Sequence, residues 1–316
     1  MASFFKHHWF VCFLIGLFAM GYHQSQVFRP ILEWQIARDA IVFFVMWAMG
    51  FTLPAAQFRD SLRDPKPALL AISINTLIVP LLVLPCYYWL PTDFFGGLFV
   101  SAIVPSTLAS ASVWTRRAGG NDSVSMMTTV VTNLGCVVVV PLGIWLVLEQ
   151  QANLDPWLQV TKLTILVVIP LVLSQIMRHL GAGAWADRHK SGFGLATQFG
   201  ILAMVFWGSI SSSVVPSDGT ASPTGELGPV SLLVICVSFI HSVALWLGII
   251  LARRAKLLPR NQIAVGFAGS QKTLMIGLQI AIECGVSVLP MIVYHVGQLL
   301  IDTVVADRWK QKYSDP

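Results

Sequence analysis

Lys272 places an ammonium group in the middle of an apolar run that extends over 261–284. A Lys at the centre of a membrane-spanning helix costs roughly 2.5–3.5 kcal/mol to insert, so it needs a partner, a water-filled cavity or loss of its proton. It lies about eleven residues inside the run, too deep for its side chain to reach the membrane surface freely. We therefore expect Lys272 to face the protein interior, either in a transport site or as a purely structural cation.

The residues beside Lys272 are poor helix formers, and a second segment has the same character. The two segments are Gly266-Phe-Ala-Gly-Ser-Gln-Lys-Thr273 and Pro105-Ser-Thr-Leu-Ala-Ser-Ala-Ser112. A helix broken inside a bilayer leaves backbone N–H and C=O groups that hydrocarbon cannot pair, so the break must face protein or water. Matched breaks would present helix ends and hydroxyls to a bound ion or anion, whereas the alternative is close packing through small residues. The candidate binding residues here are Ser110, Ser112, Ser270, Gln271, Lys272 and Thr273.

Five further polar residues lie in apolar runs. His295, Gln298 and Asp302 are three and four residues apart, so they share one helix face and either line a pathway or bond neighbouring helices. Asp302 is close enough to the end of its run that we expect partial solvation. His241 and Asn75 lie at similar depth in two other runs and are candidate site residues, with a hydrogen-bonded core histidine as the alternative for His241.

The composition requires that the elements carrying these residues lie in a membrane. The chain has 316 residues, of which 55% are hydrophobic and 11% charged, whereas about a quarter are charged in a soluble domain. Mean hydropathy is +0.72. The apolar runs are continuous over roughly 18–25 residues, which predicts helices and not the alternating strands of a β-barrel. The predicted class is an all-α polytopic membrane protein with the lipid bilayer as a partner.

The sequence favours no enzyme, resident cofactor or nucleic-acid partner. It contains no HExxH, GxSxG or Walker motif, and an intramembrane hydrolase using Ser with Lys or His is the remaining enzymatic alternative. The five cysteines are scattered singly, so neither a disulfide framework nor a metal framework is expected.

Ten spans can be marked between polar, Pro or Gly breaks, and their flanking charges predict an orientation. The spans are 9–23, 36–53, 67–90, 94–115, 121–148, 158–180, 193–214, 230–252, 261–284 and 287–307. Lys162 and Lys272 lie within spans, and Lys162 is expected to extend towards the membrane surface. Apart from Arg29 and Arg38, the remaining Lys and Arg fall on one side. Both termini are therefore predicted to lie in the cytoplasm. The predicted location of the protein is the cell (inner) membrane.

An even division of ten spans gives two sets of five that enter the membrane from opposite faces. Residues 1–148 form the predicted first repeat (helices 1–5) and residues 158–309 the second (helices 6–10). Such inverted repeats are common in secondary transporters, which bind substrate and coupling ions near broken helices.

Three segments resemble the bile acid:sodium symporter family, in particular a divergent branch with a Lys at the second helix crossover. They are Pro105–Ser123, Gly266–Leu274 and Pro290–Gln298. The resemblance implies a panel domain (about 9–53 and 158–214) and a core domain (about 67–148 and 230–307). It also implies that the broken fourth and ninth helices cross within the core.

The resemblance further implies a degenerate sodium site. Ser110, Ser125, Thr129 and Gln271 match positions that bind sodium in the coupled relatives, and Asn75 stands where those relatives have a Gln. Three positions depart: Ala111 replaces an Asn, Phe267 a Glu and Lys272 an Asn.

The departures change the charge of the site by two units, because a carboxylate is lost and an ammonium is added. Two like charges about 4 Å apart repel by roughly 4 kcal/mol at an effective dielectric of 20, which disfavours sodium beside a charged Lys272. We hypothesise that the ammonium replaces the ion, giving sodium-independent or proton-coupled transport of a small organic anion, bile-acid-like or otherwise amphipathic. The alternative function is a non-transporting membrane regulator or ion-homeostasis protein with the same fold.

Overall fold

The computed structural model describes residues 2–54, 58–108, 110–152, 155–214 and 227–314. Within these ranges the regular structure is entirely helical, with no strand, as the sequence predicts. The elements are α1 (Ala2–His23), α2 (Ser25–Phe28), η1 (Arg29–Glu33), α3 (Gln35–Phe51), α4 (Phe58–Arg63), α5 (Lys66–Ser73), η3 (Ile74–Ile78), α6 (Val79–Val83), η4 (Leu84–Tyr88), α7 (Thr92–Ile103), α8 (Ser110–Arg117), α9 (Asp122–Ala152), α10 (Pro156–Leu163), η5 (Thr164–Val168), α11 (Ile169–Met177), η6 (Arg178–Ala182), α12 (Gly183–Arg188), α13 (Lys190–Val214), α14 (Leu227–Arg254), α15 (Pro259–Ser270), α16 (Leu274–Cys284) and α17 (Leu289–Ser314).

Six to seven stretches of the described chain are long and apolar enough to cross a bilayer. The six uninterrupted ones are Lys66–Tyr88, Asp122–Leu148, Pro156–Arg188, Lys190–Ser213, Leu227–Arg254 and Leu289–Lys310. The seventh candidate joins Trp9–His23 to Ser25–Glu33 across an 86° bend. Each of the seven overlaps one of the predicted spans.

The other three predicted spans are short or interrupted. Helix α3 has 17 residues, which is at the lower end of the roughly 17–25 that cross a bilayer. The predicted spans 94–115 and 261–284 are each divided into two helices, α7 with α8 and α15 with α16. Each division falls in one of the two segments that the sequence predicts to be poor helix formers, 105–112 and 266–273.

The two interruptions have different local causes. Helix α7 ends at Ile103 because Pro105 disfavours helical geometry in the preceding residue, and Val104 is extended (φ −71°, ψ 157°). Helix α15 ends without a proline: Gln271 and Thr273 are extended, with ψ of 144° and 135°. The second interruption must therefore be held by contacts with other elements.

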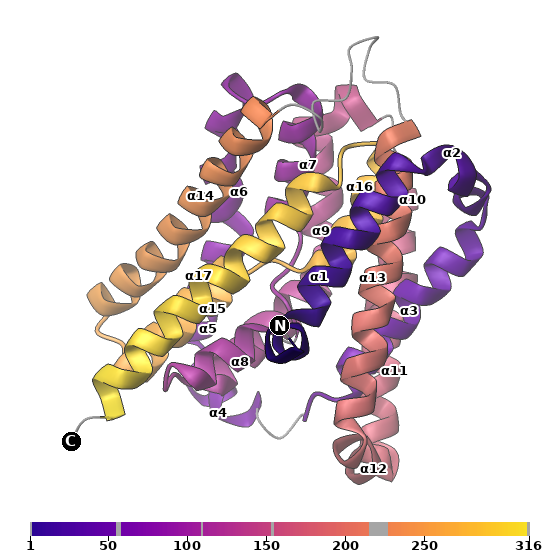
Figure 1. Cartoon of the computed structure of the whole chain (residues 1–316). Coiled ribbons are helices and arrows are strands. Elements are labelled where there is room, and N and C mark those ends of the chain that lie inside the picture. The colour runs from indigo at the N-terminus through magenta and orange to yellow at the C-terminus, as the bar shows by residue number, and fades with distance from the viewer. Residues whose placement is uncertain (1, 55–57, 109, 153–154, 215–226, 315–316) are drawn as a thin grey trace.

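The helices pack in two groups that meet around the interruptions (Figure 1). In one group α13 packs on α1 and α3, and α3 packs on α11. In the other, α15 packs on α5, α9 and α14, and α17 packs on α7, α8 and α14. Contacts between α13 and α16 and between α9 and α10 join the groups.

Gly97 allows α7 to pack closely on the segment that joins α16 to α17. A Cβ at this position would overlap the carbonyl oxygen of Ser287, between α16 and α17, and lie 2.9 Å from Cγ of Pro290. Backbone cannot move aside as a flexible side chain can, so the position excludes larger residues.

We expect Gly97→Ala to lower the melting temperature of the purified protein. The added methyl group overpacks the contact at a cost of roughly 1–3 kcal/mol, whereas the higher helix propensity of Ala returns only about 1 kcal/mol. Gly135→Ala in α9 is the matched control, since a Cβ there meets no atom within 4 Å. Thermal unfolding followed by tryptophan fluorescence measures both variants. Equal or higher stability of Gly97→Ala relative to the control would contradict the close approach.

Candidate functional site

The two interruptions touch each other. The backbone N–H of Thr273, just before α16, donates to the carbonyl oxygen of Pro105, just after α7, at 2.9 Å. This bond joins segments that are more than 160 residues apart in the chain, so the four helix ends around the two interruptions lie at one place.

The second interruption is held by side chains from other helices. The side chain of Gln298 on α17 forms a two-point bond with the backbone of Lys272: Oε1 accepts from the N–H and Nε2 donates to the C=O, each at 2.9 Å. Asn75 Nδ2 donates to the carbonyls of Gly269 and Gln271 at 3.3 and 2.8 Å. These contacts replace the helical hydrogen bonds that the extended backbone has lost.

The first interruption is held by α9. Thr132 Oγ1 accepts from the N–H of Ser106 at 3.2 Å, and Asn133 Nδ2 donates to the carbonyl of the same residue at 3.0 Å. Thr129 Oγ1 donates to the carbonyl of Thr107 at 3.2 Å. Sequence reasoning missed Thr132 and Asn133, although polar residues three to four positions apart in this apolar run were a usable signal.

The Lys272 ammonium lies inside the contact region and is 2% exposed, so the expected inward orientation is confirmed. Its Nζ donates to the carbonyl of Asn75 at 2.6 Å, to Oδ1 of the same residue at 3.1 Å and to the carbonyl of Val104 at 3.0 Å. All three acceptors are uncharged. The Val104 carbonyl belongs to the C-terminal end of α7, the negative end of the helix dipole, which favours a cation.

The Asn75 carbonyl is free for Lys272 because the helix widens there. In the π-turn of η3, the N–H of Val79 donates to the carbonyl of Ile74, five residues back. The next residue, Pro80, has no N–H, so neither position donates to Asn75 O. A proline five residues after Asn75 was therefore the sequence signal for this acceptor.

A second buried network reaches from the interruption to α14 and α17. Ser110 Oγ donates to Gln271 Oε1 at 2.8 Å, and Gln271 Nε2 donates to Asp302. His241 Nε2 is 2.8 Å from Asp302 Oδ1, and its Nδ1 is 3.3 Å from the carbonyl of Ser270. His241 is therefore hydrogen-bonded on both ring nitrogens, as the core-histidine alternative expected.

The expectation that Asp302 is partly solvated is wrong, because its carboxylate is fully buried. Both of its oxygens are hydrogen-bonded within the protein, one to His241 and the other to Gln271. The carboxylate therefore sits beside the interruption and supplies the negative charge that Phe267 does not. The Phe267 ring packs instead on Trp309, with ring centroids 5.7 Å apart.

The remaining candidates are divided among different neighbourhoods. Ser125 Oγ is bonded to Thr115 at 2.6 Å, Ser112 is bonded to Asp122, and His295 Nδ1 is 3.1 Å from Gln298 Nε2. Ser270 Oγ donates to the carbonyl of Phe267 at 3.4 Å, one turn back in α15. Of the four positions of the degenerate sodium site, Ser110 and Gln271 are bonded directly to each other. Ser125 is bonded instead to Thr115, and Thr129 to the carbonyl of Thr107.

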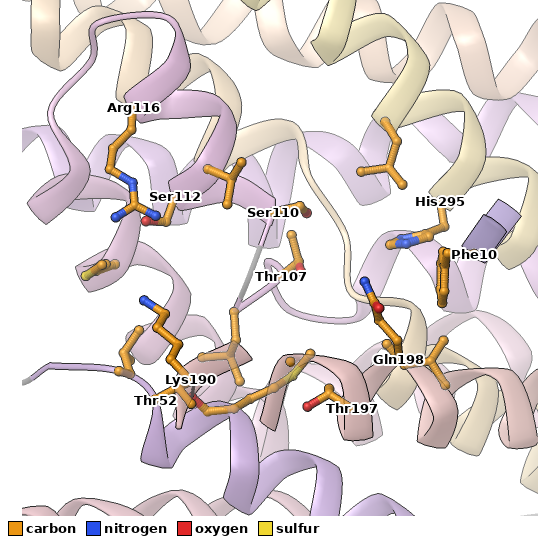
Figure 2. A pocket seen from close by; sticks show the side chains of 18 residues that line it. Phe10, Thr52, Thr107, Ser110, Ser112, Arg116, Lys190, Thr197, Gln198 and His295 are labelled. Carbon is orange, nitrogen blue, oxygen red and sulfur yellow. Dashed lines mark hydrogen bonds between the residues drawn. The ribbon is translucent and has the colours of Figure 1, made fainter. Parts of the chain in front are cut away.

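A crevice of about 350 Å³ lies beside Ser110, between α1, α3 and α13 on one side and α8, α9 and α17 on the other. Its walls are largely apolar, with Phe10, Met49, Leu53, Leu108, Val113, Met126, Ile201 and Leu299. Figure 2 shows Arg116 and Lys190 at one end and His295 with Gln198 at the other. The crevice thus combines an amphipathic interior with a cationic end.

An all-helical membrane protein with a polar site at two interrupted helices, beside a crevice between two helix groups, has the architecture of a secondary transporter. Comparison with known proteins identifies the family. The chain belongs to the SBF-like CPA transporter family, whose model matches residues 8–311. This is a family of transporters and not of enzymes, and the resemblance to bile acid:sodium symporters is confirmed.

Individual relatives are distant and carry related descriptions. The chain is 26% identical to the putative symporter YfeH of Escherichia coli over 75% of this chain and 73% of that protein. It is 26% identical to sodium/bile acid cotransporter 7-B of Xenopus laevis over 85% of this chain and 80% of the relative. It is 25% identical to the probable sodium/metabolite cotransporter BASS4 of Oryza sativa subsp. indica over 85% of this chain and 68% of that protein.

We expect Gln298→Leu to destabilise the protein strongly, because it leaves the buried N–H and C=O of Lys272 unpaired at about 1–3 kcal/mol each. Gln35→Leu, at an exposed position that begins α3, is the matched control. Thermal unfolding of both purified variants measures the difference. If Gln298→Leu melts at the temperature of the control, the interruption does not depend on this side chain.

Proposed function

We propose that the protein moves an organic anion across the membrane by alternating access, with one helix group (the core) moving against the other (the panel). The observation that carries the proposal is the crevice, which lies between the two groups and reaches Ser110. Because Ser110 is bonded to Gln271, a ligand in the crevice contacts the interrupted region directly. In this proposal residues about 9–53 and 158–214 form the panel and residues about 67–148 and 230–307 the core, which the packing of α13 on α1 and α3 and of α15 on α5, α9 and α14 supports.

We infer a ten-span topology with two inverted repeats, residues 1–148 and 158–309. Helix α3 and the two divided helices, added to the seven long candidates, give ten. The interruptions fall in the fourth and ninth of these, which are equivalent positions in the two repeats. Helices α4, α8 and α12 lie at one end of the molecule (Figure 1), and their basic flanks support a cytoplasmic location of that end, with both termini, in the cell (inner) membrane.

The proposed substrate is a small amphipathic acid. The apolar walls of the crevice fit a hydrocarbon skeleton, and the end with Arg116 and Lys190 fits an anionic group. Arg116 is also paired with Asp122 at 3.5 Å, so Lys190 is the cation more available to a ligand. The relatives described as bile acid and metabolite cotransporters support this class.

We further propose that the Lys272 ammonium takes the place of a sodium ion. Carbonyl and amide oxygens surround its Nζ as they would surround a metal cation, and no carboxylate is among its bonded partners in the described chain. Transport would then be independent of sodium or coupled to protons, and the family relationship would not extend to the coupling ion.

Replacing choline with sodium at constant ionic strength is expected to leave the melting temperature of the wild-type protein unchanged. Lys272→Asn removes the ammonium and frees the Asn75 and Val104 carbonyls, so its melting temperature should rise with sodium as ligand binding stabilises the folded state. Lys190→Asn, at an exposed position, is the control and should not respond. Stabilisation of the wild type by sodium would contradict the replacement.

Cholate and its uncharged methyl ester test the crevice, because the ester keeps the steroid skeleton and loses the negative charge of the carboxylate. We expect wild-type protein to bind cholate more tightly than the ester. The double variant Arg116→Gln/Lys190→Gln should lose roughly two- to thirtyfold of its cholate affinity, from about 0.2–1 kcal/mol for each partly exposed charge, and keep its affinity for the ester. Isothermal titration measures both. Failure of folded protein to bind either compound would contradict an amphipathic substrate and favour the regulator.

A further inference from the structure

A second charged cluster lies where α3, α10 and α16 meet. Lys162 Nζ of α10 is 2.6 Å from Glu283 Oε1 of α16, and Arg38 Nη2 of α3 is 3.9 Å from the same oxygen. Gln279 of α16 donates to both Glu283 and Asp39, the latter at 3.0 Å. Lys162 therefore does not extend freely to the membrane surface as the sequence suggested, but is tied to a carboxylate of the other helix group.

Two buried donors in this cluster have no hydrogen-bond acceptor in the described part of the chain. They are Arg38 Nε, on a side chain that is 7% exposed, and Nε2 of Gln159, a residue that is 4% exposed. The nearest charged oxygen to Arg38 Nε is Asp39 Oδ1, at 3.6 Å, beyond good hydrogen-bond geometry. Leaving such donors unpaired is costly, so each of the two can take an acceptor oxygen from a ligand. Among its described residues the same cluster also holds one unpaired buried acceptor, Oε1 of Gln279.

The unpaired donors line a cavity of about 280 Å³ that also includes Lys162 and Glu283. Among the described lining residues there is one other carboxylate, Asp155, one oxygen of which accepts from the N–H of Trp157 at the start of α10. Arg38 and Lys162 thus both approach the carboxylate of Glu283, and Arg38 also lies near that of Asp39. This cavity differs from the crevice described above and shares no lining residue with it.

We propose that Arg38, Gln159 and Lys162 form a second carboxylate-binding site, which Glu283 occupies as an internal ligand in the present conformation. The inference rests on the proposed alternating access. When α16 separates from α3 and α10, Glu283 leaves with it, and the carboxylate of the transported anion takes its place. The three donors all belong to the helix group proposed as the panel, so they stay together as the core moves.

This arrangement couples the separation of α16 from α10 to the binding of the substrate carboxylate. The Lys162–Glu283 ion pair holds α10 and α16 together and closes this end of the molecule, which is opposite to α4, α8 and α12 (Figure 1). An external carboxylate that competes for the same cations stabilises the separated state. A ligand can shift the conformational equilibrium only by such differential binding to the two states.

Cholate binding to Glu283→Gln tests the site, since this variant keeps the shape of the side chain and removes the competing charge. We expect a roughly tenfold gain in cholate affinity relative to wild type and no gain for methyl cholate. Adding Arg38→Gln or Lys162→Gln to Glu283→Gln should abolish the gain. Adding Arg116→Gln, in the other cavity, should leave the gain intact. The swapped pair Lys162→Glu/Glu283→Lys retains an ion pair and controls for folding by its melting temperature.

The outcomes separate this inference from the proposed function. Cholate binding that depends on Arg116 and Lys190 but does not change in folded Glu283→Gln would overturn the second site and leave the crevice in place. A gain that persists when Arg38 and Lys162 are both replaced would also overturn it. Loss of cholate binding in every folded protein, wild type included, would overturn both proposals.

Discussion

The pairing of backbone groups at the two interruptions is the constraint on which the rest of the structure depends. Within a bilayer, an extended segment loses its helical hydrogen bonds and has no water to replace them. Here the carbonyls from Ala268 to Lys272 are each bonded, by side chains of Ser106, Asn75, His241, Tyr294 and Gln298. The polar residues of α9, α14 and α17 are therefore first of all backbone partners, and they fix the geometry on which any binding site is built.

Charge at the interruptions is arranged around Gln271. Its carbonyl accepts from Asn75, which also binds the Lys272 ammonium, and its amide donates to the buried Asp302. One fixed cation and one carboxylate thus lie within a few hydrogen bonds of each other, whereas the sequence comparison with sodium-coupled transporters suggested a net gain of positive charge. Burying each charge alone would be far more costly than burying both among polar partners.

Much of this architecture follows from local sequence. The apolar runs predict the membrane class, the Pro105 and Gly266–Thr273 segments predict the interruptions, and the depth of Lys272 predicts its burial. What cannot be predicted is which distant group each polar atom meets. Asp302 lies near the end of its run, but the rotation of α17 directs it inward to His241. The Lys162–Glu283 pair likewise joins residues over 100 positions apart, and no local periodicity encodes it.

The central claim is that a tethered ammonium fills the position of a coupling ion. Crystals of the protein grown with thallium(I), which replaces monovalent cations and scatters anomalously, test it most directly. The account predicts continuous density from Lys272 to the carbonyl oxygens of Asn75 and Val104, and no thallium peak among those oxygens, Gln271 and Ser110. An anomalous peak coordinated by these groups, with the Lys272 amine displaced, would contradict it.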